Sequence, residues 1–116
     1  MMDNGQGIRV FTRLSVLAEA GSYYSKTMSV GHSNAISVQS EIAELIGKPT
    51  VIAYLDGSND GQQWVELSTV LSSDKIGSFT GTVNDAALHF FRVRVVVQGT
   101  RPDAAILTTD VYLSRQ

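Results

Sequence analysis

The fold is decided by residues 52–67, which read IAYLDGSNDGQQWVEL. Two runs of apolar and β-branched residues flank a polar cluster whose side chains can hydrogen-bond their own backbone and whose glycines tolerate positive φ. This pattern predicts a β-hairpin whose turn holds its own shape through Asp56, Ser58, Asn59, Asp60 and Gly61. Trp64, the only tryptophan, follows the turn, and we expect its large ring to cover the end of a hydrophobic core.

The run with the strongest strand character lies after the hairpin, at residues 88–97. Alternation predicts a core face made of Phe91, Val93, Val95 and Val97. The opposite face then carries one aromatic ring and two cations, and it consists of Phe90, Arg92, Arg94 and Val96. Further strand patterns cover residues 64–71, 79–83 and 105–113, with a turn at 99–103.

Two strands and one ambiguous segment precede the hairpin. Residues 8–20 alternate with period two, so that Arg9 and Arg13 point outward. The set that alternates with the apolar positions is Arg9, Phe11, Arg13, Ser15, Leu17 and Glu19. A second short strand is expected at 23–30. Residues 34–46 fit both helical spacing and alternation, and we interpret them as a strand because their neighbours are strands. Gly47, Lys48 and Pro49 end this element.

These elements amount to about seven or eight short strands separated by turn signals. Such a pattern is typical of an all-β, single-domain antiparallel β-sandwich of jelly-roll type. We expect the sandwich to span residues 8–116. Residues 1–7 are polar and rich in glycine, and they predict an N-terminal arm that is held by a neighbouring subunit or added to its own sheet as a strand.

Composition favours a chain that works in an assembly. The 116 residues suffice for one core, and only 17% of them are charged, so the surface is rich in small polar residues. Low surface charge weakens the defence of a small domain against association. The absence of cysteine excludes disulfides and thiolate metal sites.

Charge and hydropathy argue against two classes of partner. The net charge is −2 and neither sign forms a block, so we expect no nucleic-acid partner, which would require clustered positive charge. No apolar run approaches the roughly 18 residues of a membrane span. The first twenty residues lack the basic start and apolar run of a signal peptide, so we expect neither a membrane partner nor Sec export.

Two family resemblances rest on the hairpin and the late strand. Residues 55–67, LDGSNDGQQWVEL, followed by FFRVRV at 90–95, resemble the SNDG-x-x-W and RY-x-R-I signature of discoidin-like, galactose-binding jelly rolls. They also resemble small β-sandwich structural proteins of tailed-phage particles, which often carry a QGSNDG-x-x-W hairpin, a late LRV-x-V strand and a Gly-Thr turn. The short interval between the motifs, and Phe91 where discoidin domains often have tyrosine, fit the phage resemblance better.

The search for reactive or metal-binding groups favours structural roles. Asp56, Ser58 and Asp60 imitate part of a calcium loop, but Leu67 stands where an EF-hand needs a bidentate Glu, so a self-bonded turn is favoured over a looser calcium site. His32 and His89 have no Asp, Glu or His three or four residues further on and are interpreted as structural.

Paired carboxylates and catalytic motifs are not found either. Glu41 and Glu44 are expected to point to opposite faces of a strand, which argues against a catalytic pair. The sequence carries no G-x-S-x-G, H-E-x-x-H or phosphate-cradling motif. We therefore expect no enzymatic activity, no cofactor and no resident metal.

The favoured function is that of a non-enzymatic structural protein that self-assembles or decorates a larger particle. The phage resemblance implies a virion, with the chain made in the host cytoplasm. Strand edges pair readily with other chains, and aromatic and arginine side chains are enriched at interfaces. We expect contacts through Phe90, Arg92 and Arg94, and through the arm residues Met1, Met2, Asp3 and Asn4.

The alternative function is a discoidin-like carbohydrate-binding module. Such a module needs an exposed loop aromatic with polar groups converging beside it. Tyr23 and Tyr24 are the nearest candidates in this chain.

Overall fold

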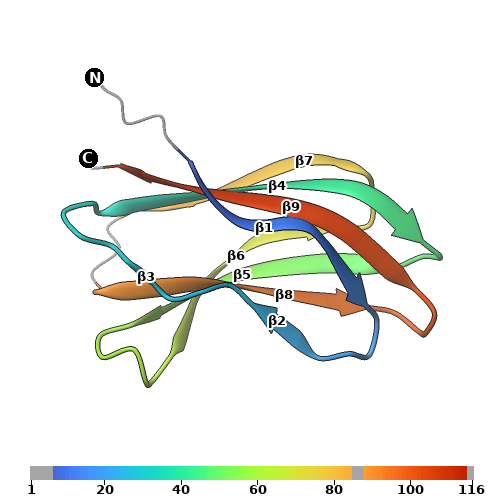
Figure 1. Cartoon of the computed structure of the whole chain (residues 1–116), viewed down its shortest axis with the longest axis horizontal. Coiled ribbons are helices and arrows are strands. Elements are labelled where there is room, and N and C mark those ends of the chain that lie inside the picture. The colour runs from blue at the N-terminus through green and yellow to red at the C-terminus, as the bar shows by residue number, and fades with distance from the viewer. Residues whose placement is uncertain (1–6, 85–87, 115–116) are drawn as a thin grey trace.

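The computed structural model describes residues 7–84 and 88–114. These residues form two antiparallel sheets packed face to face, so the predicted all-β sandwich is confirmed (Figure 1). The strands of the described part are β1 (Ile8–Leu17), β2 (Ser22–Tyr24), β3 (Met28–Ser29), β4 (Ala35–Ile46), β5 (Thr50–Ser58), β6 (Val65–Ser73), β7 (Gly77–Val83), β8 (Phe90–Gln98) and β9 (Ala104–Ser114).

Strand order shows how distant segments become neighbours. Sheet A has the order β1-β9-β4-β7, and sheet B has the order β2-β8-β5-β6 with β3 paired to β8. Strands β8 and β9 therefore lie in different sheets although only a short turn joins them. Within residues 7–84 and 88–114, no helix is long and apolar enough to cross a membrane.

The core lies between the two sheets and follows the predicted alternation. Phe91, Val93, Val95 and Val97 on β8 are all buried, as the sequence predicts. Sheet A contributes buried side chains from β4 and β9 to the same cluster, among them Ile36, Ile42, Leu107 and Val111. One continuous core therefore joins the sheets.

Trp64 is a correction to the sequence prediction. Its ring is half-buried and lies outside the core cluster. The reason is a neighbour on the outer face of sheet B, since the guanidinium of Arg92 lies 4.2 Å from the centre of the Trp64 ring. The ring packs on a cation of the sheet surface instead of covering the core.

Two expected strands have a different course. The segment at 34–46 is strand β4, so the helical reading is wrong, but the strand expected at 23–30 is divided into β2 and β3. The break occurs at Ser25, whose Oγ accepts a hydrogen bond from the Val93 N–H at 2.8 Å and donates one to the Lys26 carbonyl at 2.9 Å. The Ser25 side chain takes the place of one backbone acceptor there.

Register shifts also change which side chains share a face. Shifts between Arg9 and Phe11 and between Phe11 and Leu14 interrupt the alternation of β1, so Phe11 is buried although Arg9 is exposed. A shift between Ile42 and Glu44 pairs Glu41 with Thr108 and Glu44 with Ile106. Both glutamates therefore lie on the outer face, and the expectation that they point to opposite faces is wrong.

Four of the turns lie at the same end of the sandwich. The turns at 18–21, 47–49, 74–76 and 99–103 all lie at the right-hand end of Figure 1. On one side, β6 and β7 close on each other: a Cβ added at Gly81 would lie 2.5 Å from the Val70 carbonyl oxygen. Glycine is required for this approach, which brings β7 of sheet A into contact with β6 of sheet B.

Candidate interaction surfaces

The β5–β6 turn is held by its own side chains. The Ser58 Oγ accepts hydrogen bonds from the N–H groups of Asp60 and Gly61 at 3.3 and 2.9 Å, and it donates one to Asp60 Oδ1 at 3.0 Å. Asp60 Oδ1 also accepts the N–H groups of Gln62 and Gln63 at 2.8 and 2.9 Å. These hydrogen bonds from Gln63, Gln62 and Ser58 lower the pKa of Asp60 below its ordinary value.

The Ser58 hydroxyl and Asp60 Oδ1 are therefore occupied by the turn itself. Gly61 has a φ of 75°, the left-handed conformation that glycine adopts without strain. Asn59 lies at the exposed tip. Across the described part of the chain, no group of three or more His, Cys, Asp or Glu side chains could hold a metal ion.

The outer face of sheet B carries a four-residue charge cluster, here called the Asp56 network: Asp56, Glu66, Arg92 and Arg94. Asp56 is only 3% exposed, and its Oδ2 lies 3.3 Å from Arg92 Nε and 3.1 Å from Arg94 Nε. Arg94 Nη2 also donates to Glu66 Oε1 at 3.0 Å. Charged partners satisfy one another across β5, β6 and β8, which makes this burial tolerable.

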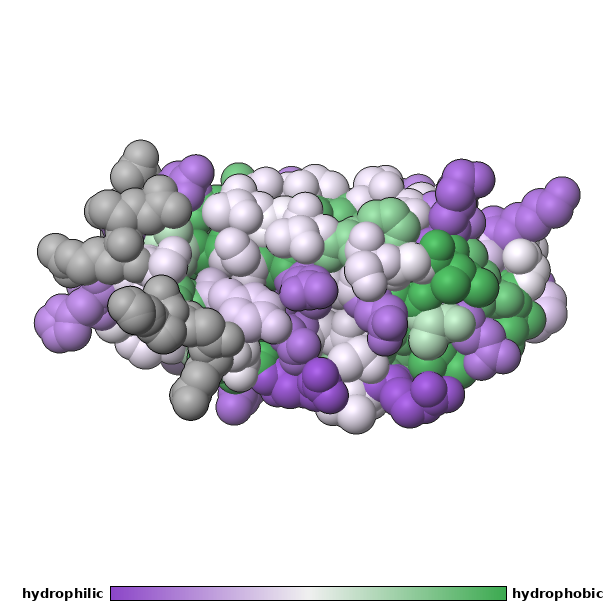
Figure 2. Space-filling view, turned by 90° about the horizontal axis from the view of Figure 1, so that it is seen from above, coloured by the Kyte–Doolittle hydropathy of each residue, from purple (hydrophilic) through white to green (hydrophobic). Residues whose placement is uncertain are grey.

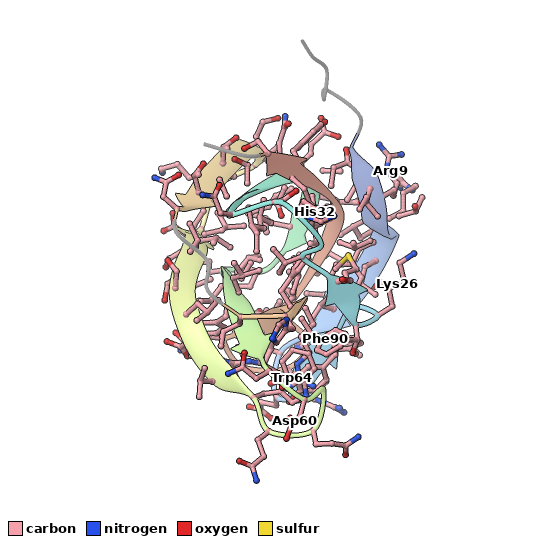
Figure 3. The ribbon with its side chains drawn as sticks, turned by 90° about the vertical axis from the view of Figure 1, so that its left-hand side faces the viewer. Arg9, Lys26, His32, Asp60, Trp64 and Phe90 are labelled. Carbon is pink, nitrogen blue, oxygen red and sulfur yellow. The ribbon has the colours of Figure 1, made fainter. Side chains whose placement is uncertain are left out.

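Aromatic rings cover the two guanidinium groups of the Asp56 network. The Cζ atom of Arg92 lies 4.2 Å from the ring centres of both Tyr24 and Trp64. The Cζ atom of Arg94 lies 4.1 Å from the ring centre of Tyr54. Cation–π contact adds to the ion pairs and ties β2, the β5–β6 hairpin and β8 together. Figure 3 shows Trp64 beside the hairpin that carries Asp60, on the side of the molecule away from Arg9.

Three of the predicted contact residues, Phe90, Arg92 and Arg94, lie on β8. Arg92 and Arg94 both form ion pairs with Asp56 of the same chain. Phe90 is half-buried, and its ring centre lies 6.5 Å from that of His89. Contacts of these three residues with another subunit stay a prediction. The other predicted contact residues, Met1, Met2, Asp3 and Asn4, lie outside the described residues.

The outer face of sheet A is mostly polar. Arg9 Nε donates to Asp110 Oδ1 at 2.8 Å, and this hydrogen bond and the charge of Asp110 raise the pKa of Arg9. Ser37 and Thr82 share a hydroxyl hydrogen bond of 2.9 Å. A shallow pocket of about 150 Å³ is lined by Arg9, Gln39, Glu41, Ser78, Thr108 and Asp110.

One end of the protein differs from this polar face. Three large apolar side chains are well exposed there: Leu17 at 41%, Ile46 at 50% and Ile76 at 62%. We call them the apolar end patch. Figure 2 shows a green area at the right-hand end of the sheet A side, with purple side chains around it. No sequence pattern predicts this patch as a whole, although the alternation at residues 8–20 places Leu17 in the same set as the outward Arg9 and Arg13.

A second cavity lies beside the hairpin turn. It has a volume of about 210 Å³ and is lined by polar turn residues and two apolar side chains: Gly57, Ser58, Asn59, Asp60, Gln63, Val65 and Leu88. A Cβ at Gly57 would meet the side chains of Leu88 and Leu67, which would have to shift to make room for it. Tyr23 and Tyr24, the predicted sugar-binding aromatics, lie on β2 and do not line this cavity.

Comparison with known proteins gives structural likeness only. No family model and no curated protein sequence matches the chain. The SPBc2 prophage-derived protein YomS has a similar structure, with a TM-score of 0.56 and 13% identity over 94% of this chain and 92% of that one. A structure reported for Bacillus endospore appendages, which form disulfide-linked pili, matches with a TM-score of 0.47 and 16% identity over 98% of this chain and 96% of that one. The likeness to YomS identifies the fold as a β-sandwich also found in a prophage-derived protein.

Proposed function

We propose that the chain is a non-enzymatic structural protein that self-assembles or decorates a larger particle, and that this particle is a virion. The observation that carries the proposal is the apolar end patch. The exposed fractions of Leu17, Ile46 and Ile76 are 41%, 50% and 62%, and all three residues lie at one end of the sandwich. Clustered exposed apolar side chains mark interaction sites, since their burial by a partner stabilises the complex.

Fold and motif support a phage-type setting. The structural likeness to a prophage-derived protein covers nearly the whole of both chains. The hairpin motif and the late arginine strand resemble structural proteins of tailed-phage particles. In such a subunit, the Asp56 network stabilises sheet B by linking β5, β6 and β8 through ion pairs.

The strand edges favour side-chain contacts over strand addition. Strand β1 is an edge of sheet A, and its two register shifts break the regular row of backbone groups that a new strand needs. The opposite edge of that sheet, β7, packs against β6. We therefore place assembly contacts at exposed side chains.

Light scattering behind a sizing column tests the proposal on the full chain at several concentrations. We expect a mass that is a multiple of 12.5 kDa, or very large particles, with the share of assembled protein rising with concentration. A mass of 12.5 kDa at the highest concentration would contradict self-assembly.

Carbohydrate binding is retained as the second candidate function because of the 210 Å³ cavity at the hairpin. Asn59 and Gln63, which carry side-chain amides, line it together with Val65 and Leu88, a combination that suits a sugar ring. A glycan array tests this candidate, with an Asn59→Ala, Gln63→Ala double variant as control. Binding that is equal for both proteins, or absent, would exclude this cavity as a sugar site.

A further inference from the structure

We propose that the partner of the apolar end patch is a second copy of this chain, bound about a twofold axis through the patch. This inference rests on the proposed function and names the occupant of its interface. In a twofold contact the same surface is used on both subunits, so it has to be complementary to itself. The apolar row across sheet A and the charges at this end of the protein meet that condition.

The register of sheet A places three apolar residues in one row. Leu17 on β1 and Ile46 on β4 both pair with Ala104 on β9, so the three residues form one row across three strands. Their neighbours Val16 and Ala105 are fully buried in the core, and alternation therefore turns the row outward. Ala104 is itself buried and lies between Leu17 and Ile46 in the register, so the row is apolar throughout.

Exposed charged side chains of both signs lie at this end of the protein, three of each. The exposed acidic side chains are Glu19, Glu44 and Asp74, and the exposed basic ones are Lys48, Lys75 and Arg101. They come from the turns at this end and from β4. Within the residues that the structure describes, none of the six forms an ion pair. Asp103, by contrast, accepts the Thr100 N–H in its own turn at 3.4 Å.

A balanced rim selects a copy over other classes of partner. A membrane surface or a nucleic acid would require an excess of positive charge around the apolar centre. Two copies related by a twofold axis can place acidic groups opposite basic ones, which favours this pairing and its register. An apolar centre with a polar rim is also the usual anatomy of a protein interface.

The other exposed apolar side chains lack these features. Tyr24 already lies against the guanidinium of Arg92. Val65, which is 56% exposed, stands beside the hairpin cavity at the other end of β6 from the apolar end patch. Val65 is therefore a matched control, because it is as exposed as Ile46 and also lies at a strand end.

Sedimentation velocity and light scattering on the full chain test the inference with Ile46→Glu and Val65→Glu. We expect the wild type to form a species of twice 12.5 kDa. Ile46→Glu should raise the dissociation constant at least tenfold, because it places a charge in the apolar centre, whereas Val65→Glu should change it less than twofold. Circular dichroism checks that both variants are folded, as their exposed positions predict.

A charge-reversal pair tests whether the partner is a copy. One variant carries Lys48→Glu, Lys75→Glu and Arg101→Glu, and the other carries Glu19→Lys, Glu44→Lys and Asp74→Lys. Each alone should be monomeric through repulsion between like charges, and an equimolar mixture should form dimers again. Failure of the mixture to associate would overturn the twofold contact.

The outcomes separate the two proposals. If the wild type associates, and Ile46→Glu and Val65→Glu change the dissociation constant equally, the assigned surface is wrong while the proposed function stands. If the wild type stays monomeric at all concentrations, self-assembly itself is contradicted. Association that is lost in Ile46→Glu and restored by mixing the charge variants supports both.

Discussion

Asp56 carries a charge on the outer face of sheet B, yet only 3% of its surface is exposed. Arg92 and Arg94 on the neighbouring strand form ion pairs with its carboxylate, and aromatic rings cover both guanidinium groups. A buried carboxylate is stable only while such partners hold it, so its substitution leaves two cations without their main acceptor.

The residue-scale prediction concerns Asp56→Asn. The substitution keeps the shape of the side chain and removes the charge, and we expect the free energy of unfolding to fall by about 2 to 3 kcal/mol. Urea denaturation measures the change. Asp110→Asn is the matched control, because its ion pair with Arg9 is solvent-exposed and should contribute much less to the free energy of unfolding. Equal losses in the two variants would show that burial gives the Asp56 network no advantage.

At the scale of the element, a single hydroxyl divides an edge strand. The Ser25 N–H donates to the Val93 carbonyl at 2.8 Å, and the Val93 N–H donates to Ser25 Oγ at 2.8 Å. The side chain thus supplies the acceptor that a continuous strand would supply from its backbone. Strands β2 and β3 stay attached to β8 although the ladder between them is broken.

Ser25→Ala should leave the buried Val93 N–H without an acceptor. An unsatisfied buried donor costs about 1 to 3 kcal/mol, so we expect hydrogen exchange of the Val93 amide to accelerate by about tenfold or more. Nuclear magnetic resonance measures this rate residue by residue. In the control Ser29→Ala, the lost acceptor serves the Gly31 N–H in an exposed turn, and Val93 should keep its protection. Unchanged exchange at Val93 in Ser25→Ala would refute the assigned role.

At the scale of the whole molecule, the two sheets share one core. Leu55 and Phe91 of sheet B belong to the same buried cluster as Ile42 and Val111 of sheet A. The close approach of Gly81 to Val70 adds a contact between β7 and β6 at one side. Neither sheet can keep its buried face if the other is lost, so the domain should lose its structure as one unit.

Unfolding in urea should therefore be a single cooperative transition. Fluorescence of Trp64 reports on the outer face of sheet B, and far-ultraviolet circular dichroism reports on the strands of both sheets. We expect the two signals to have the same midpoint and the same slope. Circular dichroism of Trp64→Phe should also show a single transition, which checks that the cooperativity of unfolding does not depend on the tryptophan ring. Separate midpoints in the wild type would mean that the sheets unfold independently.

The sequence by itself determined the local features of this protein. Period-two alternation identified the core face of β8, and glycine with short polar side chains identified the hairpin turn at 56–61. These signals act between residues close in the chain, so they are readable without knowledge of the neighbours in space. The choice of strand for residues 34–46 depended only on the elements around it.

Tertiary structure decided everything that depends on strand order and register. Bulges changed the phase of alternation, which buried Phe11 and brought Glu41 and Glu44 to one face. Trp64 left the core because Arg92, distant in sequence, lies under its ring. The row of Leu17, Ala104 and Ile46 exists only because β9 pairs with both β1 and β4. Alternation indicates which residues share a face, but topology decides which faces and which strands meet.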